Sequence, residues 1–223
     1  DRLEGRRFIV ASLTEKEVRR HTQPPFINST LQQEASRKLG FSVKKTMMVA
    51  QQLYEGVEIF GASTGLITYM RTDSTNLAES ALAQAIEVIR SLFGQEYVEG
   101  GRRFKSRKGA QEAHEAIRPV DVSLHPEKLQ KELSRDQYRL YDLIWKRMVA
   151  SQMKEAVLNQ TAVDVVPLED AAPSGKNDFV FRANGQRIVF PGFMKVYIEG
   201  DDEEEGHVSG VNVAGVASEN FLP

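Results

Sequence analysis

The chain has 223 residues, of which 41% are hydrophobic and 27% charged, and it has no cysteine. This length and composition suit one large or two ordinary globular domains, and they exclude a disordered chain. The lack of cysteine excludes a disulfide framework and a thiolate metal site, and it suits the cytosol. The sequence has no apolar run near the roughly 18 residues of a membrane span, so no membrane partner is expected. Its charged first residues lack the apolar centre of a signal peptide and suggest an excised fragment of a longer protein.

The formal net charge is −2, from 29 basic and 31 acidic residues, which by itself argues against a nucleic-acid-binding protein. The charges are unevenly distributed, with an acidic run at residues 201–205 and a basic cluster at residues 102–108. A local basic cluster can bind phosphates even on a neutral chain. The simpler interpretation of both runs is a solvated loop.

The first part of the chain combines a strand-like stretch, "RRFIVASL", with a turn-like stretch, "TQPPF". Pro24 and Pro25 cannot continue a helix, so a boundary is expected near Asn28.

Helices dominate the middle of the chain. Ser29 and Gln32 form a capping-box signal for a first helix that is expected to end at Gly40. Ser42 is expected to cap a second helix that ends at Gly56. Two short helices joined by a glycine turn resemble a helix-turn-helix.

Two more helices are predicted further along. Apolar residues at helical spacing predict a helix over residues 81–93 that ends at Gly94. Ser134 and Gln137 are expected to cap the last helix. Its predicted buried stripe consists of Tyr141, Ile144, Trp145 and Met148. The pair Met47–Met48 is also expected in the core.

From about Ala156 the hydrophobic period changes to two, and the stretches "QTAVDVVP", "DFVFRA", "QRIVFPGFMKVYIEG" and "HVSGVNV" are predicted strands. The expected fold class is α+β and multidomain. A helical domain over residues 29–153 is inserted in a β-rich domain built from residues 1–28 and 154–223.

The stretch "GLITYMRTDS" places Tyr69 two residues before Arg71. If it is extended, both side chains point the same way. A phenol has a pKa near 10 and is a poor nucleophile without help. An adjacent guanidinium favours the phenolate and grips a phosphate, so the pair fits attack on a phosphodiester. The alternative is a packed tyrosine beside a surface charge.

Thr72, Asp73 and Ser74 follow this pair and predict a polar turn. Ser74 and Asn76 are typical helix-capping residues, so capping of the next helix is the simplest role for them.

A second group of polar residues lies in "QEAHEAIRP". On a helix, His114 and Arg118 would share a face, where His114 could donate to a phosphate and Arg118 could add a charge. Glu115 lies beside them and could hold an arginine. A single histidine near a single glutamate is a weak metal signal, and a plain surface helix is the alternative. The chain has no Asp-x-Asp pair for Mg²⁺, no phosphate-binding glycine loop and no hydrolase Gly-x-Ser-x-Gly.

Three long motifs resemble one family. The motifs resemble those of bacterial type IA DNA topoisomerase I, and they are "PPFINSTLQQEASRKLGFSVKKTMMVAQQLYEG", "GLITYMRTDSTNL" and "QEAHEAIRP". They occur in that family's order, at comparable separations, over roughly residues 24–120. The resemblance implies a winged-helix-like domain that carries the tyrosine and is inserted in a β-rich arch domain. The β-rich tail matches by pattern alone.

The resemblance also implies roles for single residues. Tyr69 matches the nucleophile, which attacks single-stranded DNA and holds the 5′ phosphate while a second strand passes. Arg71 matches the arginine that orients the scissile phosphate. The remaining expectations are DNA contacts by Arg71, Thr72, His114 and Arg118, and supporting roles for Asp73 and Glu115.

Parts of the family pattern are missing from this sequence. The toprim domain, with its acidic metal cluster, and the domain that adjoins it are absent. We therefore expect Mg²⁺ in the full enzyme, bound by the toprim domain, no metal in this fragment and no use of ATP. Expected partners are single-stranded or underwound DNA and the missing domains, and the expected location is the cytoplasm, at the nucleoid. The isolated fragment is expected not to relax supercoiled DNA.

Two other classes compete with this interpretation. One is a non-catalytic, winged-helix-like DNA-binding module in which Tyr69 is packed or only stacks. The other is a tyrosine recombinase or type IB enzyme, which holds the 3′ phosphate and groups two arginines and a histidine around a tyrosine near the chain end. Here His114 and Arg118 follow Tyr69, which is the wrong order for that class.

Overall fold

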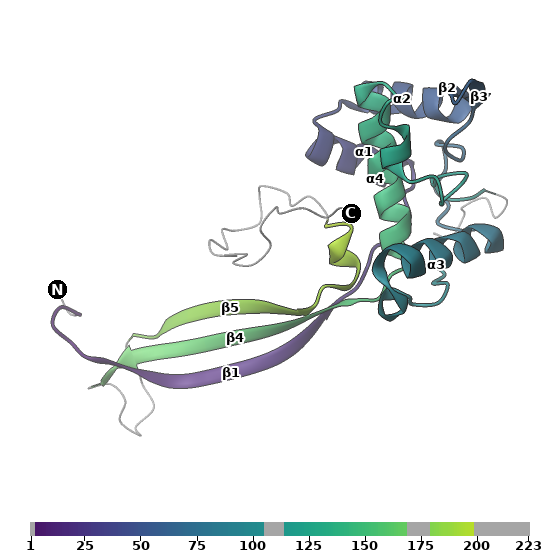
Figure 1. Cartoon of the computed structure of the whole chain (residues 1–223). Coiled ribbons are helices and arrows are strands. Elements are labelled where there is room, and N and C mark those ends of the chain that lie inside the picture. The colour runs from purple at the N-terminus through teal and green to yellow at the C-terminus, as the bar shows by residue number, and fades with distance from the viewer. Residues whose placement is uncertain (1–2, 105–113, 169–178, 199–223) are drawn as a thin grey trace. The chain divides into compact units, whose positions relative to one another are not determined.

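The structure is a computed structural model that describes residues 3–104, 114–168 and 179–198. It forms two compact units (Figure 1). Among the described residues, the sheet unit takes those up to Arg20 and those from Val157 to Phe190, and the helical unit takes the rest. Within these ranges, no helix is long and apolar enough to cross a membrane.

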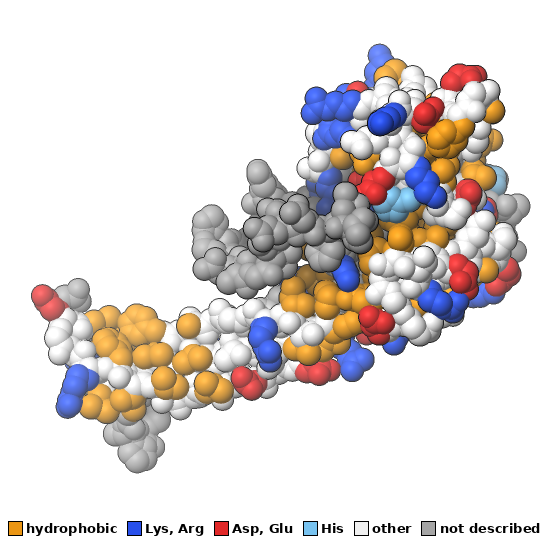
Figure 2. Space-filling model, in the orientation of Figure 1, with side chains coloured by type: hydrophobic (Ala, Val, Ile, Leu, Met, Phe, Trp, Pro, Cys, Tyr) orange, Lys and Arg blue, Asp and Glu red, His pale blue; other side chains and the backbone are white. Residues whose placement is uncertain are grey.

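The sheet unit is a three-stranded sheet in the order β1-β4-β5. Its strands are β1 (Phe8–Arg20), β4 (Ala156–Pro167) and β5 (Phe181–Phe190). β4 and β5 are antiparallel, with Thr161 opposite Gly185 and Val165 opposite Phe181. Apolar side chains remain exposed on this unit, as the orange atoms over the strands in Figure 2 show; Phe8, Val10, Leu13, Phe181 and Val189 are among them.

Asp164 joins the three strands through its carboxylate. It accepts hydrogen bonds from Arg182 on β5, at 2.6 and 2.8 Å, and from the Ser12 hydroxyl on β1, at 3.0 Å. The hydrogen bonds from Arg182 and then from Ser12 lower the pKa of Asp164 to about 2.

The strands differ from the predicted stretches in extent. β1 runs on to Arg20, and two predicted strands are one continuous strand, β5. The prediction that "QRIVFPGFMKVYIEG" is a single strand is wrong. Pro191 has no amide hydrogen for the ladder and has helical φ and ψ of −71° and −26°, so η4 (Gly192–Lys195) follows. The predicted strand "HVSGVNV" lies outside the described residues.

The helical unit is built around α4 (Arg135–Ser151), which contacts α1 (Asn28–Leu39), α2 (Val43–Glu55) and α3 (Glu79–Phe93) (Figure 1). A hairpin of β2 (Val57–Ile59) and β3 (Ala62–Thr64) follows α2. Short 3₁₀ turns complete the unit: η1 (Gln95–Tyr97), η2 (Pro126–Leu129) and η4.

The predicted stripe of α4 is confirmed as its buried face. Tyr141, Ile144, Trp145 and Met148 are buried, and the Trp145 indole donates to the Val122 carbonyl at 2.8 Å. The Tyr141 hydroxyl donates to the Leu124 carbonyl at 2.8 Å, and burial raises the pKa of Tyr141. Each buried polar group therefore has a backbone acceptor, which offsets its loss of water. The expectation for Met48 is wrong, because its side chain is 53% exposed.

Most predicted helix ends are confirmed. Gly40 ends α1 with a left-handed φ of 67°, and Ser42 caps α2 by accepting the Lys45 amide. Ser134 and Gln137 form the reciprocal capping box of α4. The predicted cap of α1 is wrong, because that helix starts at Asn28.

The actual cap of α1 uses Thr30, whose hydroxyl accepts the Ile27 amide at 3.1 Å. The Gln32 amide instead donates to the Asn28 side chain at 2.5 Å, one helical turn earlier. The predicted box at Ser29 and Gln32 thus lies two residues after the actual one at Ile27 and Thr30.

The helical unit is larger at both ends than residues 29–153. Phe26 is fully buried and pairs with Ile117 across an isolated bridge. The Tyr197 hydroxyl donates to Glu34 at 2.5 Å in a buried contact. These contacts hold the residues just after β1 and just after β5 on the helical unit, which places the unit boundaries at Arg20–His21 and Phe190–Pro191.

Replacing Ser134 with alanine should remove the capping box and lower the free energy of unfolding of the helical unit by about 1 kcal/mol. Trp145 is the one tryptophan of the chain and lies on α4, so urea unfolding followed by its fluorescence measures this directly. The control is Ser80→Ala in the first turn of α3, an exposed position that should change little. Equal effects of the two substitutions would contradict the capping role.

Candidate active site

The segment that carries Tyr69 is fixed to the end of α2 by its backbone. The Leu66 amide donates to the Leu53 carbonyl at 2.7 Å. A Cβ atom at Gly65 would lie only 2.8 Å from the Tyr54 carbonyl oxygen, so only glycine allows this approach. The last turn of α2 therefore positions the residues that lead into Tyr69.

The Tyr69 ring is 42% exposed and lies between two other rings. It meets Tyr54 edge-on with centroids 5.3 Å apart, and it meets His114 edge-on at 6.3 Å. Within the part of the chain that the structure describes, the Tyr69 hydroxyl forms no hydrogen bond. Its oxygen is thus free to meet a ligand.

Exposed and buried side chains alternate from Tyr69 onward. Tyr69, Arg71 and Asp73 are exposed, whereas Met70, Thr72 and Ser74 are buried. The alternation agrees with the expectation that Tyr69 and Arg71 point the same way, although only Ile67 in this stretch forms a strand-like bridge. Among the described residues, the Arg71 guanidinium has no hydrogen bond or ion pair, so its charge is not neutralised by a neighbour.

Two side-chain turns follow in series. The Ser74 amide donates to the Thr72 hydroxyl, and the Asn76 amide donates to the Ser74 hydroxyl, each at 3.1 Å. Thr72 is 4% exposed, so its hydroxyl shapes the chain and does not face solvent. The prediction that Ser74 or Asn76 caps the next helix is wrong, because the N-cap of α3 is Ala78.

The motif around His114 is extended where the structure describes it, from His114 onward. Ile117 pairs with Phe26, and Pro119 pairs with Ile67. The helix predicted here is therefore wrong. Proline disfavours a helical conformation in the residue before it, and the backbone groups of this segment find partners on other segments instead.

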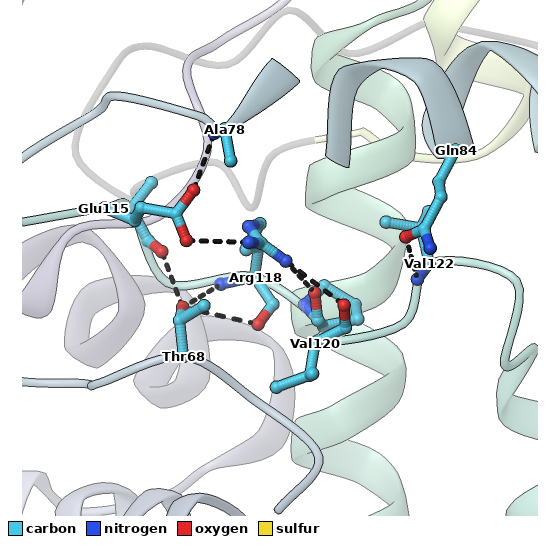
Figure 3. A network of polar contacts seen from close by, with 9 residues as sticks. Thr68, Ala78, Gln84, Glu115, Arg118, Val120 and Val122 are labelled. Carbon is cyan, nitrogen blue, oxygen red and sulfur yellow. Dashed lines mark hydrogen bonds and ion pairs between the residues drawn. The ribbon is translucent and has the colours of Figure 1, made fainter. Parts of the chain in front are cut away.

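Thr68 connects the two segments of the site (Figure 3). Its hydroxyl donates to the Ala116 carbonyl at 2.6 Å and accepts the Arg118 amide at 3.0 Å. Its amide donates to the Arg118 carbonyl at 2.9 Å. Tyr69 is the next residue, so these bonds fix the backbone of the tyrosine against the segment that carries His114.

Glu115 and Arg118 form an ion pair at 2.6 Å, as Figure 3 shows. The Arg118 side chain is only 10% exposed, and it also donates to the carbonyls of Pro119 and Val120 at 2.8 and 3.3 Å. The second carboxylate oxygen of Glu115 accepts the Ala78 amide at 2.6 Å, at the start of α3. Glu115 does hold an arginine, and that arginine is Arg118.

The structure thus divides the predicted site residues into two groups. Tyr69, Arg71 and Asp73 are exposed and His114 is half-buried, whereas Thr72 and Arg118 are buried in intramolecular contacts. Three of these residues suit a phosphate diester: the Tyr69 phenol and the Arg71 guanidinium, which form no hydrogen bond within the described residues, and the His114 imidazole. No cluster of three or more metal-binding side chains lies among the described residues.

Comparisons with known proteins identify the family of the chain. A family model described as DNA topoisomerase matches residues 1–218. The fold is similar to that of full-length topoisomerase I from Thermotoga maritima, with a TM-score of 0.73 and 39% sequence identity. The match covers 90% of this chain and 31% of that chain.

This chain belongs to the bacterial type IA DNA topoisomerases. It spans about a third of the length of the Thermotoga topoisomerase I chain. The mixed α+β fold with antiparallel sheets agrees with that match.

The sequence did not single out two residues of this candidate site. Thr68 gave no signal, because its partners are backbone atoms 48 and 50 residues away. Tyr54 was placed on the second helix but not beside Tyr69. Gly56 and Gly65 flank the β2–β3 hairpin, and these two glycines were the sequence signal for a chain that turns back to the end of α2.

Replacing Glu115 with alanine should lower the free energy of unfolding by about 2–3 kcal/mol, because it leaves the buried Arg118 charge and the Ala78 amide without their acceptor. The matched control is Glu79→Ala, which removes an exposed ion pair with Arg103 and should cost less than about 1 kcal/mol. Urea unfolding of both variants measures the difference. A similar small loss in both would show that the Glu115–Arg118 pair does not stabilise the site.

Proposed function

We propose that this chain is the tyrosine-bearing gate of a type IA topoisomerase that relaxes negatively supercoiled DNA. The observation that carries the proposal is the exposed Tyr69 on a segment fixed by Thr68, two residues before an Arg71 that no described residue pairs with, in a chain of this family. In this proposal the order α1, α2, β2, β3 is a winged-helix-like arrangement, and the three-stranded sheet is part of the arch.

The reaction is an exchange of phosphoesters. The Tyr69 phenol oxygen loses its proton and bonds to the phosphorus of one DNA strand. The bond from phosphorus to the 3′ oxygen breaks, and that oxygen takes up a proton. The 5′ phosphate stays on Tyr69 while a second strand passes through the gap. Attack by the 3′ hydroxyl then restores the strand, and ATP is not needed because the ester bond is conserved.

Arg71 orients the scissile phosphate and stabilises the charge that develops on it. His114 lies against the Tyr69 ring and donates to the DNA backbone near the cut. Asp73 is a supporting residue on the same exposed side.

For the buried residues we propose positioning roles in place of the DNA contacts expected for Thr72 and Arg118. Glu115 holds Arg118, and Thr72 shapes the turn after the tyrosine. These residues keep the nucleophile in place rather than touch the substrate.

In this proposal the residues of this chain bind DNA and carry the nucleophile, and no step is assigned to Mg²⁺ on them. We propose that the intact enzyme binds Mg²⁺ through its toprim domain. The partners are single-stranded or underwound DNA and the remaining domains of the same protein, and the site of action is nucleoid DNA in the cytoplasm.

The alternative is a non-catalytic, winged-helix-like DNA-binding module. A phenol oxygen satisfied inside the core would favour that alternative. The exposure of Tyr69, and the lack of a hydrogen bond to its hydroxyl within the described residues, favour the nucleophile.

The proposed function predicts a covalent intermediate between Tyr69 and DNA. The chain is mixed with Mg²⁺, a toprim-containing half of a type IA topoisomerase and single-stranded oligonucleotides labelled at either end. We expect an adduct that carries only the 3′-end label on a denaturing gel and that is absent in Tyr69→Phe. An adduct with only the 5′-end label would indicate recombinase-like chemistry, and DNA binding without any adduct would favour the binding module.

The second prediction concerns Arg71. In the same assay, Arg71→Ala should lower the rate of adduct formation about 100-fold, because one preorganised donor to the reacting phosphate is lost. Arg90→Ala is the control, since Arg90 is a partly exposed arginine of α3 paired with Glu87. Equal rates for the two variants would remove Arg71 from the mechanism.

The third prediction is that the purified chain alone does not relax supercoiled plasmid, since strand passage requires the remaining domains. Relaxation by the chain alone, absent in Tyr69→Phe, would contradict this.

A further inference from the structure

Tyr54 is a solvent-exposed aromatic residue beside the nucleophile. It lies in the last turn of α2, its side chain is 39% exposed, and its ring meets Tyr69 edge-on at 5.3 Å. Since Tyr69 in turn meets His114, three partly exposed rings follow one another at the site. No role in the reaction described above uses Tyr54.

The position of Tyr54 is fixed by its neighbours. Val49, Ala50 and Leu53 bury one side of α2, and Tyr54, one turn after Ala50, lies at the edge of that buried side. The close approach of Gly65 to the Tyr54 carbonyl and the Leu66–Leu53 hydrogen bond hold the Tyr69 segment against the same helix turn. Tyr54 therefore lies on a packed helix, and the segment that carries Tyr69 is held against the same helix turn.

An exposed ring in this place is suited to a nucleobase. Single-stranded DNA presents unpaired bases with free π-faces, and proteins bind them by stacking on aromatic side chains. A strand whose phosphate reaches Tyr69 brings the base of an adjoining nucleotide within reach of the neighbouring ring. Tyr54 is not one of the buried core residues, and 39% of its surface is in solvent, so part of it is open to a ligand.

We propose that Tyr54 stacks on an unpaired nucleobase of the strand that Tyr69 cleaves, next to the scissile phosphate. The inference rests on the proposed function, since it takes the ligand to be single-stranded DNA. The stacked base orients the strand, and it does so without requiring a particular base.

The experiment measures the affinity of the chain for fluorescein-labelled single-stranded DNA of about ten nucleotides by anisotropy. Tyr54→Ala and Tyr54→Leu should both bind about tenfold more weakly, and Tyr54→Phe should bind within about twofold of the unchanged protein. Leucine keeps apolar packing against Tyr69 but has no π-face, so it separates stacking from packing. The matched control is Phe60→Ala on the β2–β3 hairpin, where Phe60 is 65% exposed.

A second set of oligonucleotides, each with one abasic position, tests for the base itself. In the unchanged protein we expect the abasic position at the stacking site to weaken binding about tenfold. In Tyr54→Ala that penalty should disappear, since the partner ring is already gone. A residue that only supported the fold would not show this dependence on one base.

The outcomes separate the inference from the proposed function. If the unchanged protein binds the DNA but Tyr54→Ala behaves like Phe60→Ala, or if the abasic penalty is the same in both proteins, stacking on Tyr54 is wrong and the proposed function stands. If the unchanged protein does not bind single-stranded DNA, both are overturned. Far-UV circular dichroism and urea unfolding identify any variant that has lost its fold, and Tyr54→Leu then replaces Tyr54→Ala.

Discussion

The hydroxyl of Thr68 donates to the Ala116 carbonyl and accepts the Arg118 amide, and so joins parts of the chain 48 and 50 residues apart. The nucleophile candidate follows Thr68 directly, and the imidazole of His114 precedes Ala116 by two residues. A small hydroxyl between two backbones thus sets how Tyr69, His114 and the start of α3 lie together. The neighbouring bridge between Ile67 and Pro119 extends the same pairing. A side chain that both donates and accepts is needed at this position, because each segment offers a different backbone group.

The two arginines of the site, Arg71 and Arg118, differ in burial. Arg118 is buried, and Glu115 and two carbonyls satisfy most of its donors, although its Nε atom has no hydrogen-bond partner within the described residues. A buried guanidinium of this kind stabilises an arrangement only while its partner is present. Arg71 is exposed, and no described residue neutralises it, so its charge is available to a phosphate. Burial, and not residue type, therefore decides which arginine is open to a ligand.

The aromatic rings of the site depend on backbone geometry in the same way. Tyr69 and Tyr54 are 15 positions apart, with a hairpin between them, yet their rings touch because Gly65 lets the chain return to the end of α2. A nucleophile on an extended, exposed segment would sample many positions. Contact with a ring on a packed helix, together with the Thr68 bonds, restricts it before any DNA arrives. The proposed reaction replaces one phosphate ester by another, and it requires the attacking oxygen to be held in position in this way.

The sequence by itself determined the features that rest on local chemistry. The caps at Ser42 and Ser134, the stop at Gly40 and the buried face of α4 depend on residues within a turn or two of one another, so their patterns predicted them. The motifs of the family, including Tyr69 and Arg71, were also readable in the sequence. Only the tertiary structure decided that the His114 motif is extended, that Thr72 and Arg118 are buried, and that Tyr54 lies beside Tyr69. The physical reason is that each of these depends on partners distant in the chain, and long-range backbone pairing overrides the helical spacing that a short stretch of sequence suggests.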